Sequence, residues 1–223
     1  DLKRLTDHRP FDPQLEQLDF TIAANDFPIQ LIFPKLLKEL SEEGVQLRIR
    51  FIPSGIPRVS ILRASRYRIL ITPTPPDDPD LTMVSLIQAK MAVFYDSTVR
   101  KPPETWQEFA ESNHVEVKFS DTESSLMALH SLDQSKMKPP IISVPNFSSL
   151  APMIKETDRI TTQLGAMKYG LLKELDTAAL PFETETLNLF MVWHRREQGD
   201  PAHQWLRARI IETVNCILKI NSR

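Results

Sequence analysis

The stretch "LDFTIAANDFPIQLIFPKLLKELSEEG", residues Leu18–Gly44, carries the clearest fold signal in the chain. A short apolar run ends in small residues, as a buried strand does, and is followed by apolar side chains at helical spacing. These side chains are Ile29, Ile32, Phe33, Leu36, Leu37 and Leu40. Asn25 or Asp26 can cap the start of the helix, and Gly44 suits the left-handed position after its end. The stretch therefore predicts a strand followed by a helix, the repeating unit of α/β proteins.

The same alternation continues along the chain. "VQLRIRFI" and "YRILIT" are predicted strands, with a short helix at "SGIPRVSILRA" between them. From Leu81 a long strand enters a second series, in which helices are predicted at 122–132 and 166–175. An apolar strand at Leu187–Trp193 and a helix from about Pro201 to Leu218 complete the chain. We predict an α/β protein of two lobes, each a mainly parallel sheet flanked by helices, joined by crossing strands. A small ligand would bind in the cleft between the lobes.

Composition limits the classes of function. The 223 residues are 41% hydrophobic and 25% charged, which is typical of a globular protein, and no apolar run is long enough to cross a bilayer. A net charge of -2 argues against binding of phosphates by bulk electrostatics. The single cysteine, Cys216, excludes an internal disulfide and agrees with a reducing cytoplasm. The start, "DLKRLTDHRP", has no apolar signal core and no initiator Met, so we expect a processed or excised chain.

No catalytic motif is present. Nucleophile-elbow, phosphate-loop, dinucleotide-binding and zinc-protease patterns are all missing, and the closest histidines, His194 and His203, have no standard ligand spacing. The densest group of polar side chains, "MVWHRREQGDPAHQWLR" at Met191–Arg207, is interpreted as structure. In this interpretation Trp193 packs, 195–199 is a turn of solvated charges, and Asp200 caps a helix. We therefore predict no enzyme, no metal and no cofactor.

Three motifs, in order, resemble one family. "VPNFSSLAPMIKETD" at Val144–Asp158 fits the pattern V-P-x-F-x4-P-x4-T-D. Together with "FTIAANDF" near the start and "WHRREQGDPAHQWLR" near the end, it resembles the effector-binding region of LysR-type transcriptional regulators. The branch it looks most similar to responds to nodulation flavonoids, salicylate or nitroaromatic compounds. The resemblance runs from about Phe11 to Arg207.

The resemblance implies a fold similar to that of periplasmic binding proteins of type II. Residues 1–16 would be the remnant of a linker, 17–92 with 195–221 lobe 1, and 93–194 lobe 2. The chain would cross outward near Met91–Tyr95 and return near Leu189–His194. Members of the family carry a winged helix-turn-helix domain ahead of this region, through which alone they bind DNA. They pair their effector domains into dimers and assemble into tetramers. Leu31, which falls off the predicted core stripe, is a candidate for that interface or simply an isolated exposed leucine.

Candidate effector-binding residues in lobe 1 follow the first two strands. Asn25 and Asp26 open the first helix, whose amides and dipole suit a carboxylate. Asp26 would itself repel an anion and can instead cap this helix. Pro53, Ser54 and Gly55 follow the second strand and offer a hydroxyl and amides, or else form an ordinary turn.

Candidates in lobe 2 are Ser120, Thr122 and Ser124, at the start of a predicted helix, with Asn146 and Phe147. Thr122 can equally be a cap, and Phe147 is either an aromatic wall or, more often for such a residue, part of the core. In the salicylate-responsive branch histidines occupy the positions of Ser124 and Asn146. Neither side chain here titrates near neutral pH, which favours a differently polar or uncharged effector.

The resemblance implies a ligand-sensing and oligomerising part of a cytoplasmic transcription factor. Its effector would be a small molecule, such as an aromatic or other organic acid, and no membrane contact is implied. The chain departs from the family along the elements that border the cleft, at "SRYRILIT", "YDSTVRKPP" and "TDRITTQLG". Two alternatives remain at this point: a periplasmic-type solute-binding protein, and an enzyme of the same two-lobe fold.

Overall fold

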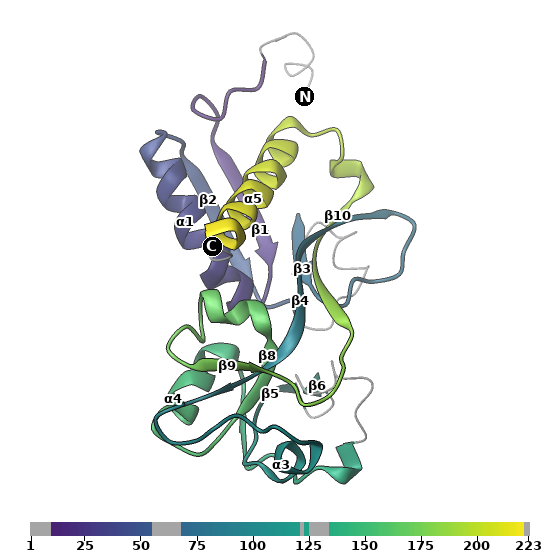
Figure 1. The fold of residues 1–223 in the computed structure, drawn as a ribbon. Coiled ribbons are helices and arrows are strands. Elements are labelled where there is room, and N and C mark those ends of the chain that lie inside the picture. The colour runs from purple at the N-terminus through teal and green to yellow at the C-terminus, as the bar shows by residue number, and fades with distance from the viewer. Residues whose placement is uncertain (1–9, 55–67, 121–122, 125–133, 221–223) are drawn as a thin grey trace.

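A computed structural model describes residues 10–54, 68–120, 123–124 and 134–220. The described chain forms two lobes, one above the other in Figure 1, connected by the long strands β4 and β10. The predicted two-lobe α/β fold is confirmed, but the strands of lobe 2 are not mainly parallel as predicted, because β8 and β9 run antiparallel to β4.

One mixed sheet of seven strands runs through both lobes, in the order β2-β1-β3-β10-β4-β8, with β9 also paired to β4. Its lobe 1 part consists of β1 (Leu18–Ala23), β2 (Leu47–Ile52), β3 (Ile69–Thr72), β10 (Thr186–His194) and the first part of β4 (Leu81–Tyr95). Strand β1 is parallel to β2 and β3, whereas β10 is antiparallel to both β3 and β4. The sheet is thus mixed because the crossing strands run against their neighbours.

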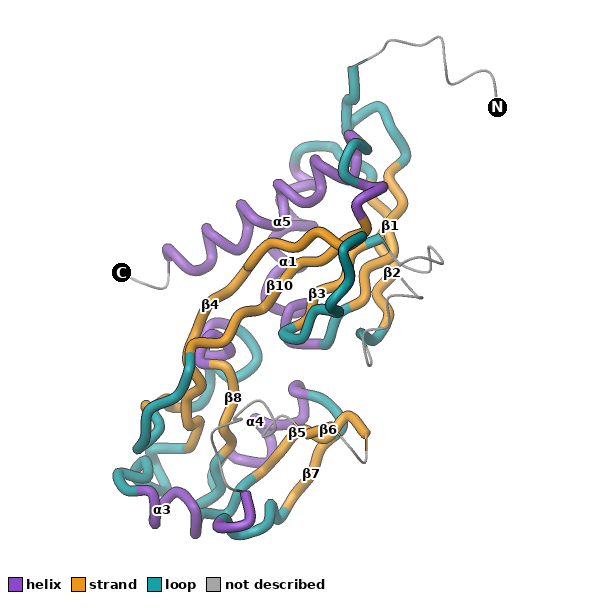
Figure 2. Tube along the Cα trace, turned by 90° about the vertical axis from the view of Figure 1, so that its right-hand side faces the viewer, coloured by secondary structure: helices purple, strands orange, loops and turns teal. Residues whose placement is uncertain are grey.

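Helices α1 (Asp26–Glu42) and α5 (Pro201–Ile220) lie on one face of this sheet (Figures 1 and 2). Gly44 has a φ of 76° directly after α1, in the left-handed region expected of it. The α5 start is also as predicted, because the Asp200 carboxylate accepts a hydrogen bond from the His203 backbone N–H at 2.9 Å. The two helices pack their apolar stripes together into the core of lobe 1.

Lobe 2 is built from short elements. They are α3 (Trp106–Glu111), β5 (Val115–Ser120), β6 (Glu123–Ser124), η3 (Gln134–Lys136), β7 (Ile142–Val144), η4 (Phe147–Ser149), α4 (Leu150–Ile154), β8 (Thr161–Leu164), η5 (Gly165–Tyr169) and β9 (Asp176–Ala179). Strands β6, β5 and β7 form a separate small sheet, and β8 and β9 both pair with the second part of β4. A last 3₁₀ turn, η6 (Arg195–Glu197), connects β10 to α5.

Strand β4 changes partners where the lobes meet. It pairs with β10 up to Lys90, and with β8 and β9 from Met91 and Ala92 onward. Strand β10 is already paired with β4 from Thr186, so its residues after 189 lie alongside lobe 1 strands. We therefore propose a lobe boundary at Lys90–Met91 on the way out and before Thr186 on the way back, earlier than the predicted return.

Two predicted helices of lobe 2 differ from the structure. The prediction of a helix at 166–175 is wrong beyond Tyr169, because the chain turns at Gly170, and β9 follows unpredicted in the weak strand sequence "DTAA". The prediction that 120–125 opens a helix is also wrong, because Glu123 and Ser124 pair as strand β6 with β5. The short helix predicted at 54–64 lies almost wholly outside the described residues.

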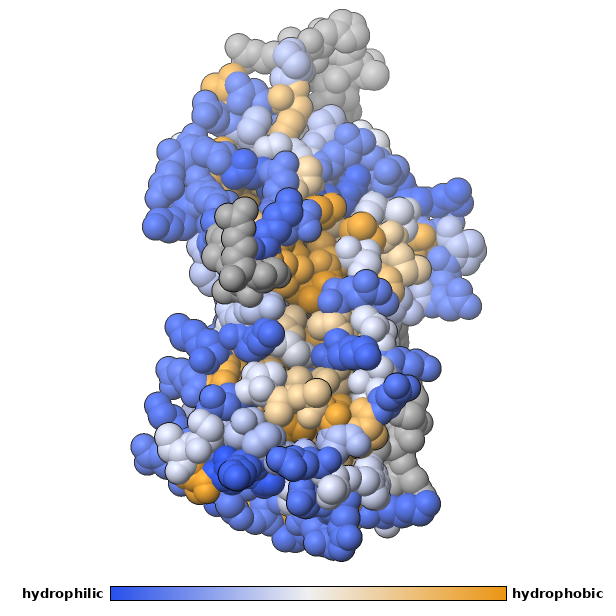
Figure 3. All heavy atoms as spheres, in the orientation of Figure 1, coloured by the Kyte–Doolittle hydropathy of each residue, from blue (hydrophilic) through white to orange (hydrophobic). Residues whose placement is uncertain are grey.

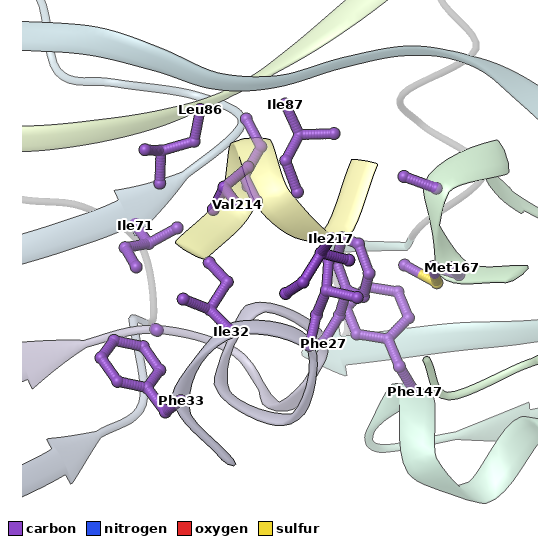
Figure 4. Close-up of a cluster of buried hydrophobic side chains, with 14 of the residues drawn as sticks. Phe27, Ile32, Phe33, Ile71, Leu86, Ile87, Phe147, Met167, Val214 and Ile217 are labelled. Carbon is purple, nitrogen blue, oxygen red and sulfur yellow. The ribbon is translucent and has the colours of Figure 1, made fainter. Parts of the chain in front are cut away.

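The two lobes share one hydrophobic core. Phe27 of α1 and Ile217 of α5 lie beside Phe147 and Met167 of lobe 2 in Figure 4, and all four belong to one buried cluster. On this side the space between the lobes is filled by apolar side chains. The cluster therefore fixes how α1 meets lobe 2.

Two leucines of α1 differ from their predicted burial, because Leu31 is buried and Leu37 is exposed. Leu31 is 7% exposed, and a Cβ added at Gly170 would lie 3.4 Å from its Cδ1 atom, so it packs against lobe 2. Both interpretations of Leu31, as an exposed contact for a second copy and as an isolated exposed leucine, are therefore wrong. Leu37, assigned to the core stripe, is 37% exposed. Leu31 is buried because the first half of α1 is covered by lobe 2 as well as by its own sheet.

Candidate functional site

The ends of β1 and β2 bring the lobe 1 candidates together. Asn25 holds the N-cap position of α1 with extended backbone but makes no cap bond with its side chain. Instead its Oδ1 atom accepts a hydrogen bond of 2.6 Å from the hydroxyl of Ser54, which is buried. Pro53 is exposed beside this pair, and Gly55 lies outside the described residues. Two of the predicted residues thus form one polar group at the edge of lobe 1.

Asp26 joins the lobes. Its Oδ2 atom accepts hydrogen bonds from the backbone N–H and the hydroxyl of Ser148, at 2.6 and 2.5 Å, and its Oδ1 atom accepts one from the Phe147 N–H at 3.3 Å. Gln30, one turn further along α1, donates to the same Ser148 hydroxyl at 2.8 Å. Asp26 therefore caps η4 of lobe 2 rather than its own helix. We call this set of contacts between Asp26, Gln30, Phe147 and Ser148 the interlobe latch.

Asn146 and Phe147 have structural tasks within lobe 2. The Asn146 Oδ1 atom accepts from the Ser149 N–H at 3.0 Å and from its hydroxyl at 2.7 Å, so Asn146 caps η4. Phe147 is 9% exposed and belongs to the shared core, as the more conservative interpretation expected. The interlobe latch and this cap bring Asn25, Asp26, Asn146 and Phe147 into one region.

Phe119 was not among the predicted site residues. Its ring lies 5.5 Å from that of Phe147, edge to face, yet its side chain is 42% exposed. Val117 and Val115 are buried two and four positions earlier in β5, so the alternation of this strand could have assigned Phe119 to the same face. It is an aromatic surface at the end of β5, attached to the core through Phe147.

The remaining lobe 2 candidates are less closely defined. Ser120 ends β5, and Ser124 pairs with Lys118 across the β5–β6 ladder. Thr122 lies outside the described residues. None of these three is brought to Asn25 or Ser54 by a described contact, so they remain predictions.

The polar stretch before α5 belongs to a half-buried network of hydrogen bonds, which is separate from the latch. Arg68 donates to Glu197 at 2.6 Å and to Asp200 at 2.7 Å. Burial alone would raise the pKa of Glu197, but the Arg68 guanidinium holds it below its usual range. The prediction of a turn of solvated charges at 195–199 is therefore wrong for Glu197, which has a fixed cationic partner, whereas Arg195 and Arg196 are exposed as predicted.

His203 and Arg207 extend this network toward Trp193. The Arg207 guanidinium lies 4.3 Å from the centre of the Trp193 ring and donates to His203 Nδ1 at 2.6 Å. His203 Nε2 then donates to the Arg68 carbonyl at 3.0 Å. Trp193 is buried, as predicted. Each polar side chain of this network has a partner in the protein, as is typical of a structural network. The network consists of Arg68, Glu197, Asp200, His203 and Arg207.

Residues 13–215 match the family described as the LysR substrate binding domain. The chain belongs to this family. It is 22% identical over 215 residues to the HTH-type transcriptional activator NagR of a Ralstonia species, covering 93% of this chain and 71% of NagR. It is likewise 22% identical over 215 residues to nodulation protein D 1 of Bradyrhizobium japonicum, covering 92% of this chain and 66% of that relative.

A solved structure agrees with the fold of this LysR-family domain. The regulatory domain of MexT, a transcriptional activator in Pseudomonas aeruginosa, superimposes with a TM-score of 0.72 at 23% identity, covering 89% of this chain and 98% of that one. The predicted family is confirmed. It supports the interpretation as a domain of a transcriptional regulator over the two alternatives, a solute-binding protein and an enzyme. Among the described residues, no three His, Cys, Asp or Glu side chains are grouped to hold a metal. None of the helices in the described ranges is long and apolar enough to cross a membrane.

Proposed function

We propose that this LysR-family domain senses a small organic effector in the space between its lobes, at the side bordered by Asn25, Ser54 and Phe119. The observation that carries the proposal is the interlobe latch, in which the start of α1 and the start of η4 are hydrogen-bonded across 121 or more positions of sequence. A ligand beside the latch contacts groups from both lobes at once.

The groups available favour an organic acid with an apolar body. The first turn of α1 presents backbone N–H groups and a positive dipole end, while Ser54 and Asn25 add neutral hydrogen-bonding atoms. The negative charge of Asp26 is directed at Phe147 and Ser148, which reduces its repulsion of a bound carboxylate. Phe119 offers an aromatic face. An aromatic acid satisfies all of these groups.

The effector would act by favouring one spacing of the lobes. A ligand shifts such an equilibrium only by the difference in its affinity for the two arrangements. We propose that the change is passed, in the longer cytoplasmic protein, through paired domains of a dimer or tetramer to a separate DNA-binding part. The proposed role involves no chemical step.

A thermal-shift screen of aromatic and aliphatic acids against this chain tests the proposal. The ligand-induced shift in Tm, rather than Tm itself, should fall by at least half in Ser54→Ala and Asn25→Ala. It should be kept in Ser41→Ala, a change at an exposed serine on the same helix. A ligand whose shift is the same in all four proteins would place the effector site elsewhere.

A further inference from the structure

A cavity lies at the junction of the two lobes, apart from the residues of the proposed effector site. It has a volume of about 800 Å³ and is bounded by β4, η5, β9, the segment that follows β9 and the end of α5. Figure 3, which shows the face with the C-terminal end of α5, has hydrophobic side chains gathered at this junction. Its volume lies within the roughly 300–1,000 Å³ of typical small-molecule sites.

The wall of this cavity includes the point at which β4 passes from lobe 1 to lobe 2, which we call the hinge. Lys90 and Met91, between which β4 exchanges β10 for β8, both line it. Leu218 comes from α5 of lobe 1, whereas Ala166 and Tyr169 come from η5 of lobe 2. The packing is close here, because a Cβ added at Gly165 would lie 3.1 Å from the Lys90 carbonyl oxygen. A molecule in the cavity would therefore contact both lobes where β4 passes from one to the other.

The chemistry of the lining is that of a site for an amphipathic anion. Lys90 and Lys168 both line the cavity and are exposed, against a single carboxylate there, Glu183. Ala89, Ala178, Phe182 and Leu218 provide apolar surface between them. Lys168 lies 5.0 Å over the Tyr169 ring, which keeps its cationic end at the rim. Two cations above an apolar floor match a carboxylate on a flat hydrocarbon body.

We propose that this hinge cavity is a second ligand site, which takes a small organic anion with its carboxylate between Lys90 and Lys168 and its apolar part against Phe182 and Leu218. Over Leu81–Lys90, β10 is the only described strand that pairs with β4, so the other edge of β4 has no described strand across it. Occupation of the cavity would stabilise one angle at the hinge. The cavity is separate from the effector site proposed beside Asn25 and Ser54, and binding in it does not require an effector there.

Calorimetric titration with 2-naphthoate tests the proposal, with uncharged 2-naphthamide as the matched probe. We expect saturable binding of 2-naphthoate that weakens about fivefold in each of Lys90→Gln and Lys168→Gln. Lys173→Gln, at an exposed lysine outside the cavity, should leave the affinity unchanged. Ser54→Ala should also leave it unchanged, which separates this site from the proposed effector site.

Three results would overturn the proposal. The first is no saturable binding of 2-naphthoate with a Kd below about 1 mM. The second is an affinity that depends on Ser54 but not on Lys90 and Lys168, which would place the probe in the effector site. The third is equal affinity for 2-naphthoate and 2-naphthamide, since the two lysines would then have no role.

Discussion

The carboxylate of Asp26 in lobe 1 accepts hydrogen bonds from both the backbone N–H and the hydroxyl of Ser148 in lobe 2, at 2.6 and 2.5 Å. This is a helix cap supplied by a different lobe, because Ser148 lies in the 3₁₀ turn η4 and Asp26 in the first turn of α1. The contact ties the spacing of the lobes to the same few residues that border the proposed effector site.

Asp26→Asn should weaken the contact between the lobes. The amide keeps one acceptor but loses the charge, so we expect a loss of about 1–2 kcal/mol in the free energy of unfolding. Urea unfolding measures it. Asp19→Asn, at an exposed carboxylate in a surface ion pair with Arg48, should cost less than about 0.5 kcal/mol. Equal losses in the two variants would show that the latch contributes nothing beyond a surface charge.

Leu31→Ala and Leu37→Ala distinguish the two sides of α1. Leu31 is buried against Gly170, so its truncation should cost about 2–3 kcal/mol, whereas truncation of the exposed Leu37 should change stability by about 0.5 kcal/mol or less. Urea unfolding of the two variants under identical conditions gives the comparison. A larger effect at Leu37 would contradict the assignment of Leu31 to the lobe interface.

These leucines also show what the sequence could predict. Periodicity placed β1, α1, β10 and α5 correctly, because each element is long enough to repeat its apolar pattern, and the caps at Gly44 and Asp200 confirmed two ends. Periodicity along one helix does not reveal a second body that packs on it, so Leu31 and Leu37 were exchanged.

The candidate site was predicted in part for a related reason. Asn25, Asp26 and Ser54 were chosen because they follow strands or open a helix, and Asn146 because of its position in the family motif. The structure places all four in polar contacts. Their partners could not be predicted. The contact between Asp26 and Ser148, which are 122 positions apart in the sequence, depends on how the two lobes pack together. The same limit applies to the pairing of Glu197 with Arg68.

The free energy of unfolding should fall as the pH falls, because two histidines are buried. Burial lowers the pKa of His203, and the charges of Arg207 and Arg68 lower it further, although the hydrogen bond to the Arg68 carbonyl opposes them. Burial likewise lowers the pKa of His114, whose Nδ1 atom is buried without a partner. Below the unfolded value of 6.5 the unfolded chain therefore binds more protons, and stability is lost as the pH falls from 6.5 through the folded values.

Urea unfolding between about pH 7.5 and pH 5.5 measures this slope. His203→Gln can keep both hydrogen bonds but does not titrate, so it should flatten the slope in part, with His114 supplying the remainder. His194→Gln, at a half-buried ring that accepts only the Arg196 N–H among the described contacts, is the control. A slope that His203→Gln leaves unchanged would exclude His203 as its source.

Arg207→Lys tests the network before α5. A lysine ammonium cannot both lie flat over Trp193 and donate to His203 Nδ1, so we expect a loss of about 1 kcal/mol in the free energy of unfolding. Arg196→Lys, at a 41% exposed side chain nearby, should be close to neutral. If both changes are neutral, the contact between Arg207 and Trp193 does not contribute to stability.

The distance between the lobes tests most directly whether the interlobe latch sets their spacing. Spin labels at Lys38→Cys in lobe 1 and Lys101→Cys in lobe 2, in a Cys216→Ser background, would report that distance by pulsed electron resonance. We predict one narrow distribution in the labelled parent, a broader or displaced one in Asp26→Asn, and a renewed narrowing when a ligand from the thermal-shift screen is added. Identical distributions in the parent and Asp26→Asn would contradict the account.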